Sequence, residues 1–301
     1  RRAQPRRHPG RLFRNSAVSL LNPLIQGVLL GGLYALYAAG LSLIFGVMRL
    51  VNLAHGDFIV LAAYLMLACV TALALPAWVA LLIAMPFMFA LGWALQRLIL
   101  NRTLKNDLLV PLLVTFGLSI IIQNGLLLAF SADSRRLTVG ELEIASWTFG
   151  DISIGVVPLI TFIVAVLVIL GLTFLFYRTR LGRILRATAD STEIVQIMGI
   201  DPRHVFAIAM GLSFVVIAVA AFFMGVRANF DPAAGPSRLL YAFEAVIGGL
   251  GSFWGTLIGG TILGVAQTVG AAINPEWQQL AGHVVFLAVI LARPRGLLAR
   301  A

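Results

Sequence analysis

Long apolar runs are the feature that most restricts what this sequence can fold into. Eight runs are long enough, or nearly so, to cross about 30 Å of hydrocarbon as helices, at about 22–48, 57–75, 77–96, 108–130, 154–177, 204–226, 239–270 and 279–292. With 60% of its 301 residues hydrophobic and 11% charged, the chain does not have the composition of a water-soluble domain. The runs are rich in Leu, Ala and Gly and do not alternate as strands would. The sequence therefore predicts an all-α, polytopic membrane protein with about eight to ten membrane-spanning or re-entrant helices.

Basic residues gather in short segments beside the apolar runs. Most of the 22 lysines and arginines lie in residues 1–16, near 97–107, in 178–203 and after residue 292, whereas 131–152 carries two arginines and four acidic residues. Because basic loops of membrane proteins face the cytoplasm, we expect these segments, including a basic tail at 1–16 and the C-terminus, to be cytoplasmic. The net charge of +10 then indicates contact with anionic membrane lipid and no nucleic acid.

The first apolar runs leave two interpretations open. If the N-terminal tail and the loop near 97–107 are both cytoplasmic, the chain between them crosses an even number of times, yet it contains three runs. The first interpretation is a broken first run, with Gly31, Gly32 or Gly40 as the break and residues 49–57 beside a polar cavity. In the second, residues 49–57 form an ordinary loop and the N-terminus lies outside.

The start of the first run carries its own signal. Asn22 and Pro23 suit an N-cap and the first position of a helix. Residues 11–21 are therefore predicted to form a separate amphipathic helix on the cytoplasmic surface.

One polar cluster interrupts this hydrocarbon sequence at Asn52, His55 and Asp57. Burying a carboxylate or an amide in a bilayer costs at least a few kcal/mol, so such groups usually line a pathway or satisfy freed backbone groups. We hypothesise that Asn52 and Asp57 cap broken helix ends beside a translocation pathway, with His55 hydrogen-bonded between them.

Glu244 is the other acidic residue within an apolar run, and it precedes three glycines, Gly248, Gly249 and Gly251. These glycines predict exposed backbone near a broken helix. Two roles stay open for Glu244: a gate or pathway residue, or a carboxylate that accepts backbone N–H bonds. The glycine-rich stretch over 248–270 is predicted mainly to pack helices closely.

Signatures of catalysis are missing from the sequence. It has no H-E-x-x-H, no G-x-S-x-G and no phosphate-binding G-x-x-x-x-G-K-[ST] motif. The four histidines lack ligand spacing and Cys69 is the sole cysteine, so we expect no metal site, no cofactor and a packing role for Cys69. The chain is predicted not to be an enzyme, and any ATP-driven process would need a nucleotide site on another subunit.

Residues 178–203 combine charge with apolar side chains and predict short amphipathic helices. Gly199 suits a helix C′ position, and Asp201-Pro202 suits the start of the next spanning helix. Such a segment either docks a soluble partner or lies on the lipid surface, and the residues alone leave both interpretations open.

Four passages together carry a family resemblance. They are Gly31-Gly-Leu-Tyr-Ala-Leu with Asn52-Leu-Ala-His-Gly-Asp57, Leu181-Gly-Arg through Met198-Gly-Ile, Val246-Ile-Gly-Gly-Leu-Gly-Ser with Gly255 and Gly259-Gly260, and Arg293-Pro-Arg-Gly-Leu-Leu298. In their order and spacing the chain resembles the membrane permeases of ABC importers for branched-chain amino acids, the LivH type. The resemblance implies one transmembrane permease domain over 17–301 in the cell (inner) membrane.

The resemblance also implies partners and a mechanism. The segment 178–203 looks like the coupling element that enters a groove on an ATPase subunit, which favours docking over lipid contact. Its candidate contact residues are Arg183, Arg186, Ala187, Asp190, Glu193, Met198 and Gly199. A second permease subunit, alike or different, two ABC ATPase subunits and an extracytoplasmic substrate-binding protein would complete a transporter that works by alternating access.

Candidate pathway or helix-break residues are Asn52, His55, Asp57, Glu244, Gly248, Gly249 and Gly251. The expected function is import of branched-chain or related hydrophobic amino acids, driven by partner ATPases. Importers of urea, amides or other small solutes remain alternatives within the family. A stand-alone channel or ion-coupled carrier is the alternative from another class.

Overall fold

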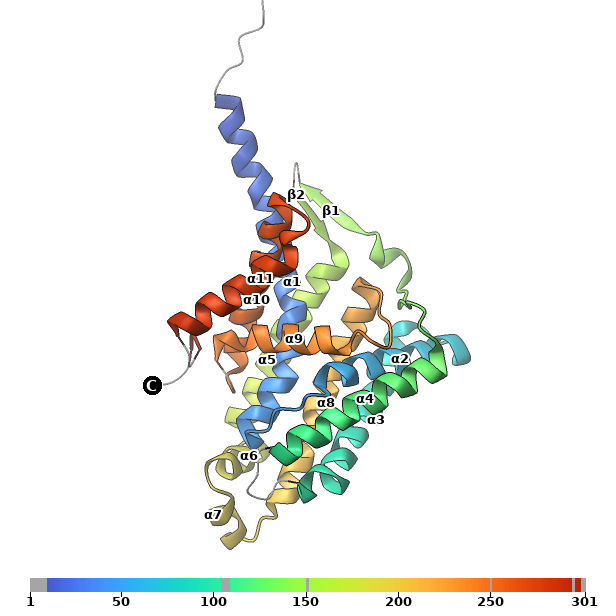
Figure 1. Cartoon of the computed structure of the whole chain (residues 1–301), viewed down its shortest axis with the longest axis vertical. Coiled ribbons are helices and arrows are strands. Elements are labelled where there is room, and N and C mark those ends of the chain that lie inside the picture. Colours follow the sequence, from blue (N-terminus) through green and yellow to red (C-terminus); the bar gives the residue numbers. More distant parts are fainter. Residues whose placement is uncertain (1–9, 104–108, 150–151, 250, 294–295, 299–301) are drawn as a thin grey trace, which may run out of the picture.

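The computed structural model describes residues 10–103, 109–149, 152–249, 251–293 and 296–298, most of them in helices (Figure 1). In chain order the α-helices are α1 (Gly10–Met48), α2 (His55–Leu73), α3 (Ala77–Leu98), α4 (Leu109–Phe130), α5 (Val156–Arg178), α6 (Arg180–Asp190), α7 (Thr192–Ile197), α8 (Pro202–Arg227), α9 (Gly235–Ala245), α10 (Phe253–Ile273) and α11 (Trp277–Ala292). The short 3-10 turns are η1 (Leu100–Arg102), η2 (Gly140–Glu143) and η3 (Val246–Gly248), and the strands are β1 (Ser146–Phe149) and β2 (Ile152–Gly155).

Seven helices of the described residues are long and apolar enough to cross a membrane: α1, α2, α3, α4, α5, α8 and α10. The apolar α11 is shorter, with 16 residues, and α9 has 11. The predicted polytopic, all-α membrane fold is confirmed, and the helices follow the apolar runs read from the sequence. The long seventh run, predicted over 239–270, is divided between α9 and α10.

The first apolar run is one continuous helix. α1 extends from Gly10 to Met48 with Pro23 inside it, so the predicted helix start at Asn22-Pro23 and the separate helix over 11–21 are wrong. Residues 1–9 of the predicted basic tail lie outside the described residues. Three candidate spans, α1 to α3, precede the loop after Leu98. Three spans agree with the second interpretation, in which residues 49–57 form a loop between two spans and the N-terminus lies outside.

The predicted breaks at Gly31, Gly32 and Gly40 are wrong for a physical reason. A Cβ added to Gly31 would lie 2.4 Å from the Cα of Thr261 on α10, and one on Gly32 would lie 2.7 Å from the Cα of Phe162 on α5. In lipid, helices associate through close backbone packing that small residues permit. These glycines therefore bring α10 and α5 against an unbroken α1.

The core is centred on α1 and α8, which are the most buried of the spanning helices. α10 packs along α1, and α3 packs against α8. Helices α4, α5 and α11 instead expose large apolar side chains such as Leu128, Leu167 and Leu291, as expected for surfaces that face lipid. Cys69 is a free, buried cysteine within the main hydrophobic cluster, which confirms its predicted packing role.

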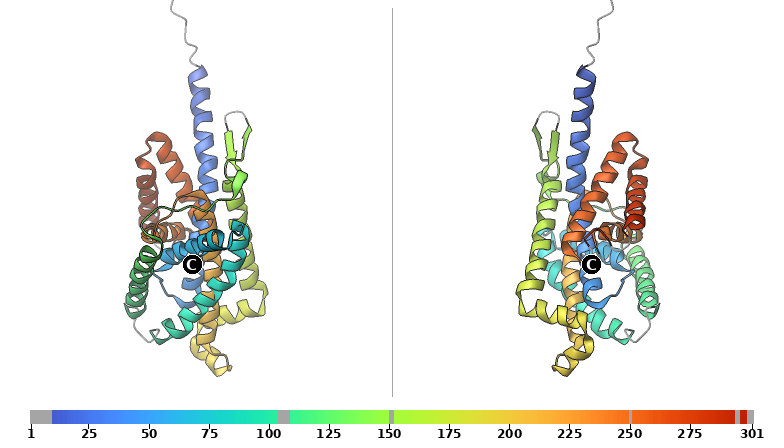
Figure 2. Two further views of the ribbon diagram at one scale, coloured as in Figure 1. Left: turned by 90° about the vertical axis from the view of Figure 1, so that its right-hand side faces the viewer. Right: turned by 90° about the vertical axis from the view of Figure 1, so that its left-hand side faces the viewer.

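The two ends of the molecule differ in structure. The antiparallel hairpin of β1 and β2, with Ser146 opposite Gly155, lies at one end. Helices α6 and α7 lie at the opposite end, as both views of Figure 2 show. α1 begins near the hairpin end and ends near α6 (Figure 1). The acidic segment 131–152 and the basic segment 178–203 are therefore at opposite ends, as their charges predicted. The start of α1 lies at the hairpin end, so residues 10–16 are not on the same side as 178–203, contrary to the prediction from their charges.

Candidate translocation and coupling sites

The first helix joint, residues 49–57, contains the polar cluster that the sequence singled out. Asn52 and His55 are fully buried, and Asp57 is 2% exposed. The side-chain oxygen of Asn52 accepts a hydrogen bond from the backbone N–H of Ala54 (3.0 Å), and its backbone oxygen accepts one from that of His55 (3.2 Å). Asn52 thus stabilises the turn that leads into α2.

His55 connects the first joint to the middle of α1. Its Nε2 lies 2.9 Å from the backbone oxygen of Tyr37, so Nε2 must carry the donated proton. Its Nδ1 is buried without a hydrogen-bond partner. The hypothesis that His55 is bonded between Asn52 and Asp57 is wrong, because the one hydrogen bond of its ring goes to a carbonyl on another helix.

Asp57 connects the same joint to α4. Its Oδ1 accepts a hydrogen bond of 2.9 Å from the Nε2 of Gln123, which also donates to the hydroxyl of Ser119 (3.0 Å). The N-cap residue of α2 is Ala54, which makes no side-chain cap bond, and Asp57 lies in the first turn of the helix. Its negative charge in the first turn still suits the positive end of the helix dipole.

Two glycines bring α9 into the first joint. A Cβ on Gly56 would lie 1.9 Å from the backbone oxygen of Gly235, and a Cβ on Gly235 would lie 1.9 Å from the Oδ1 of Asp57. No larger residue fits at either position without displacing backbone or a buried carboxylate. The first joint therefore holds the start of α2 against α1, α4 and α9.

The second helix joint, residues 246–252, separates α9 from α10, and Leu250 lies outside the described residues. Gly249 and Gly251 adopt φ values of +132° and +79°, which favour glycine. A Cβ on Gly248 would lie 1.7 Å from the backbone oxygen of Gly255. The broken helix that these glycines predicted is confirmed.

The backbone of the second joint is partly satisfied by the C-terminal segment. The backbone N–H groups of Leu297 and Leu298 donate to the carbonyls of Ile247 (3.0 Å) and Gly248 (2.8 Å). Glu244, 1% exposed, does not accept backbone N–H bonds: its Oε1 accepts a hydrogen bond from the Nδ1 of His283 on α11.

Several polar residues around Glu244 were not singled out from the sequence. The hydroxyl of Tyr34 donates to the Oε1 of Gln267 (2.5 Å), and the ring of Tyr34 lies 5.0 Å from that of Tyr241. Gln267 lies just inside the glycine-rich stretch and is a polar residue within an apolar helix, which is a readable signal. Arg227 directly follows one apolar run and Arg238 directly precedes the next, so both resemble ordinary loop charges and the sequence gives no such signal for them.

The coupling segment, residues 178–203, forms the two short helices α6 and α7, as predicted. The hydroxyl of Thr179 accepts from the N–H of Gly182 (3.0 Å) and that of Ser191 from the N–H of Ile194 (3.3 Å), so each helix has a side-chain N-cap. Gly199 ends α7 with a φ of +82°, and Asp201 caps α8, as expected.

The coupling segment exposes apolar and charged side chains together. Ile197 is 86% exposed, with Ile194 and Met198 beside it, whereas Leu185 and Val195 anchor the segment inward. The other predicted contact residues are also at this end: Arg183, Ala187, Asp190, Glu193 and Gly199 are exposed, and Arg186 is half-buried. The guanidinium of Arg186 lies 5.0 Å from the centre of the Tyr177 ring. The structure thus brings the predicted coupling residues to one surface.

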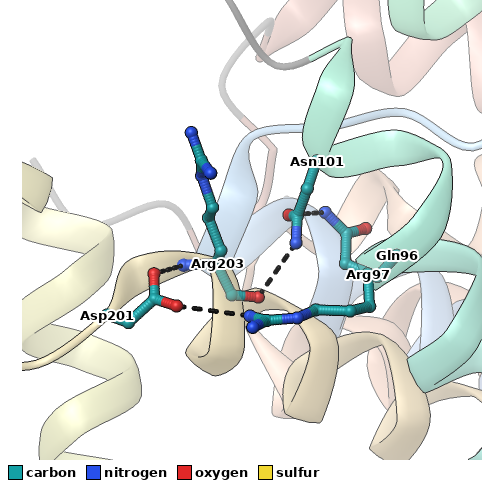
Figure 3. Close-up of polar contacts among 5 residues, drawn as sticks. All are labelled: Gln96, Arg97, Asn101, Asp201 and Arg203. Carbon is teal, nitrogen blue, oxygen red and sulfur yellow. Dashed lines mark hydrogen bonds and ion pairs between the residues drawn. The ribbon is translucent and has the colours of Figure 1, made fainter.

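Polar contacts join the coupling segment to α3 (Figure 3). Asp201 forms an ion pair of 3.2 Å with Arg97, and the amide of Asn101 donates to the backbone oxygen of Arg203 (3.2 Å) and accepts from Gln96 (2.9 Å). A cavity of about 380 Å³ lies among Arg97, Asn101, Arg102, Asp201 and Arg203. The start of α8 is therefore tied to the end of α3.

The described residues contain no group of three or more His, Cys, Asp or Glu side chains that could hold a metal ion.

The predicted pathway residues fall into two places. Asn52, His55 and Asp57 lie at the first joint, and Glu244 and the glycines lie at the second. Helix α9 links the two places, because Gly235 at its start contacts Asp57 and Glu244 lies near its end.

Comparisons with known proteins agree with this architecture. The sequence model of a family described as the permease component of branched-chain amino acid transport systems matches residues 24–292. No solved structure gives a significant match.

Curated relatives resemble the chain over most of its length. The high-affinity branched-chain amino acid transport system permease protein BraD of Pseudomonas aeruginosa is 31% identical over 93% of this chain and 96% of its own. The corresponding LivH permease proteins of Salmonella typhimurium and Escherichia coli are 30% and 29% identical, with the same coverage.

Proposed function

Because the chain belongs to the family of branched-chain amino acid transport permeases, we propose that it is the permease subunit of an ATP-binding-cassette importer. It would move branched-chain or related hydrophobic amino acids across the cell (inner) membrane into the cytoplasm. Its partners would be a second permease subunit, two ABC ATPase subunits and an extracytoplasmic substrate-binding protein. In this proposal the coupling segment and the C-terminus face the cytoplasm, in accordance with their basic residues.

The exposed apolar edge of α7 is the observation that best supports this proposal. Ile194, Ile197 and Met198 are exposed, and α7 lies at the end of the molecule opposite the hairpin (Figure 2). Apolar side chains surrounded by charge are typical of a protein interface with an apolar centre and a polar rim. The sequence has no phosphate-binding loop, so energy from ATP would have to enter the chain through such an interface.

The geometry also supplies a route by which ATP-driven motion would reach the membrane. The chain leads from α7 through Gly199 directly into α8, a long and deeply buried helix. At its start α8 is tied to α3 by Asp201 and Arg97, and along its length it packs against α1, α2 and α3. A displacement of α7 would therefore shift the central helices together, as alternating access requires.

A charge on the edge of α7 tests the proposal. We expect Ile197→Asp to reduce recovery of the ATPases with the permease, and ATP-driven leucine uptake by the reconstituted complex, by about tenfold or more. The matched control is Ile144→Asp, which places the same charge at an equally exposed isoleucine (85%) near the hairpin end and should change neither. ATPase binding and uptake that survive Ile197→Asp unchanged would contradict docking at α7.

The same vesicles test the substrate class. Uptake of radiolabelled leucine, isoleucine and valine is compared with uptake of urea, each with the binding protein present. Uptake of the three amino acids alone supports the proposed substrate, and uptake of urea alone would overturn it.

A further inference from the structure

Helix α9 lies across the middle of the molecule (Figure 1), and its sequence carries a row of polar residues. Arg238, Tyr241 and Glu244 follow one another at a spacing of three residues, so each is a surface neighbour of the next, and the row turns by about 120° around α9. The ring of Tyr241 contacts that of Tyr34 on α1, and Glu244 contacts His283 on α11. Tyr241 and Glu244 therefore face inward, toward α1 and α11, and Arg238 is partly buried.

Three buried polar atoms around this row have no hydrogen-bond partner: the Nε of Arg238, the Oε2 of Glu244 and the Nε2 of Gln267. Gln267 belongs to the same place, because its other side-chain atom accepts the hydrogen bond from Tyr34. Leaving a buried donor or acceptor unsatisfied costs about 1–3 kcal/mol, and more for a charged group. A site that keeps several such atoms has the character of a binding site whose ligand completes the hydrogen bonds.

The two arginines near the row also lack a charged partner. Neither Arg227 nor Arg238 forms an ion pair with a carboxylate among the described residues. Arg227 donates only a long hydrogen bond of 3.4 Å to the backbone oxygen of Leu29. Ionised groups inside membrane proteins are rare and usually mark a substrate or ion pathway. Positive and negative groups are thus both available to a ligand here.

From this set of groups we infer that α9 provides a contact site for the two charged ends of a free amino acid during passage. The guanidinium of Arg238 would bind the substrate carboxylate, and the Oε2 of Glu244 would bind its ammonium group. Gln267 and Tyr34 would complete the hydrogen bonds. Arg238 and Glu244 are about 9 Å apart along the helix axis, so their long side chains can approach a small zwitterion from two sides.

The inference deepens the proposed function and rests on it. A neutral solute such as urea has neither a carboxylate for Arg238 nor an ammonium group for Glu244. A site with one cation and one carboxylate therefore favours zwitterionic amino acids over urea or amides. The branched side chain would lie against the apolar groups of the neighbouring helices, which discriminate weakly between leucine, isoleucine and valine.

The first experiment measures leucine transported per ATP hydrolysed by the full complex in vesicles. We expect Glu244→Gln and Arg238→Gln each to lower this ratio by about tenfold or more, while ATP hydrolysis stays within about twofold. Arg238→Lys, which keeps the positive charge, should retain most transport. The control Glu276→Gln makes the same change at an exposed carboxylate and should have no effect. Unchanged ratios in both Gln variants would overturn the inference.

A second measurement does not depend on the folding of those variants. Cys69 is the only cysteine, so Gln267→Cys in a Cys69→Ala background gives one addressable thiol at the site. We expect leucine-loaded binding protein with ATP to slow modification of this thiol by methanethiosulfonate reagents at least about threefold. An unchanged rate would overturn the inference even if the Gln variants fail to assemble. The proposed function itself fails separately, if the unmodified complex moves no leucine.

Discussion

The two helix joints are alike in backbone and different in polar chemistry. Both depend on close backbone contact at glycine: Gly56 against Gly235 in the first joint, and Gly248 against Gly255 in the second. In the first, His55 bonds to Tyr37 and Asp57 to Gln123, and the atoms left without a partner, the Nδ1 of His55 and the Nδ2 of Asn52, belong to uncharged groups. Around the second, the atoms without a partner include those of charged groups, the Oε2 of Glu244 and the Nε of Arg238.

This difference separates a structural role from a binding role. The bonded groups of the first joint position its helices. An atom without a partner costs more stability when its group is charged, so the atoms of Glu244 and Arg238 are the stronger candidates for contact with a ligand. The cluster that is most conspicuous in the sequence, at Asn52, His55 and Asp57, is therefore better suited to holding helices together. The less conspicuous surroundings of Glu244 are better suited to binding substrate.

The largest effect is expected at the closest contact of the first joint. Gly56→Val places side-chain atoms on the backbone of Gly235, and we expect a loss of about 3 kcal/mol or more, seen as failure to recover folded protein in detergent. Gly117→Val on α4 is the control, because a Cβ there meets nothing within 4 Å. Equal thermal midpoints for the two variants would show that the joint is not tightly packed.

The second joint allows the same steric test, with a smaller expected loss of stability. Gly248→Ala adds one methyl group against the Gly255 carbonyl, and we expect destabilisation of about 1–3 kcal/mol with a lower thermal midpoint. Gly251→Ala isolates backbone strain, since its nearest contact is 3.4 Å away and its φ is +79°, and it should cost about 1 kcal/mol. If Gly251→Ala destabilises more than Gly248→Ala, backbone conformation and not packing defines this joint.

Asp57→Asn distinguishes the two joints most clearly. The asparagine oxygen can still accept from Gln123, without the charge, so we expect destabilisation of about 1–2 kcal/mol and an unchanged ratio of leucine moved to ATP hydrolysed. For Glu244→Gln we expect the reverse: nearly unchanged stability and a lower ratio of leucine moved to ATP hydrolysed. If Asp57→Asn has a normal thermal midpoint but loses most transport, Asp57 lies on the pathway, and the two joints do not differ in role as proposed.

The smallest effect is expected outside both joints, at the ion pair between Arg97 and Asp201. Because both side chains are substantially exposed, Arg97→Ala should change stability by less than about 1 kcal/mol, and less again at high salt. Thermal midpoints at two salt concentrations measure this. A large loss of stability that does not depend on salt would show that this ion pair contributes more to the contact between α3 and α8 than its exposure indicates.

Most of the helices could be predicted from the sequence because a bilayer demands long apolar segments. The ends of the coupling segment were also readable, since Gly199 and Asp201 have local conformational roles. The predicted break in α1 failed at Gly31 and Gly32, because a glycine that admits a neighbouring helix looks the same in sequence as one that ends its own. Only the positions of Thr261 and Phe162 distinguish the two.

The candidate sites were predictable residue by residue but not in their partners. Asn52, His55, Asp57 and Glu244 stood out because polar groups are costly in hydrocarbon. Their bonds join positions far apart in the chain, such as His55 to Tyr37 and Glu244 to His283, and no local pattern encodes them. Arg238 was missed because a charge at the edge of an apolar run usually lies in solvent, and only the fold places α9 inside the molecule.

The most direct test of the central claim is leucine uptake into vesicles that contain either the chain alone or the chain with its second permease, ATPases and binding protein. The account predicts uptake by the complete complex that requires ATP, and no exchange of leucine by the chain alone. Leucine exchange by the chain alone, at the rate of the complex and indifferent to ATP, would contradict it and identify a stand-alone carrier.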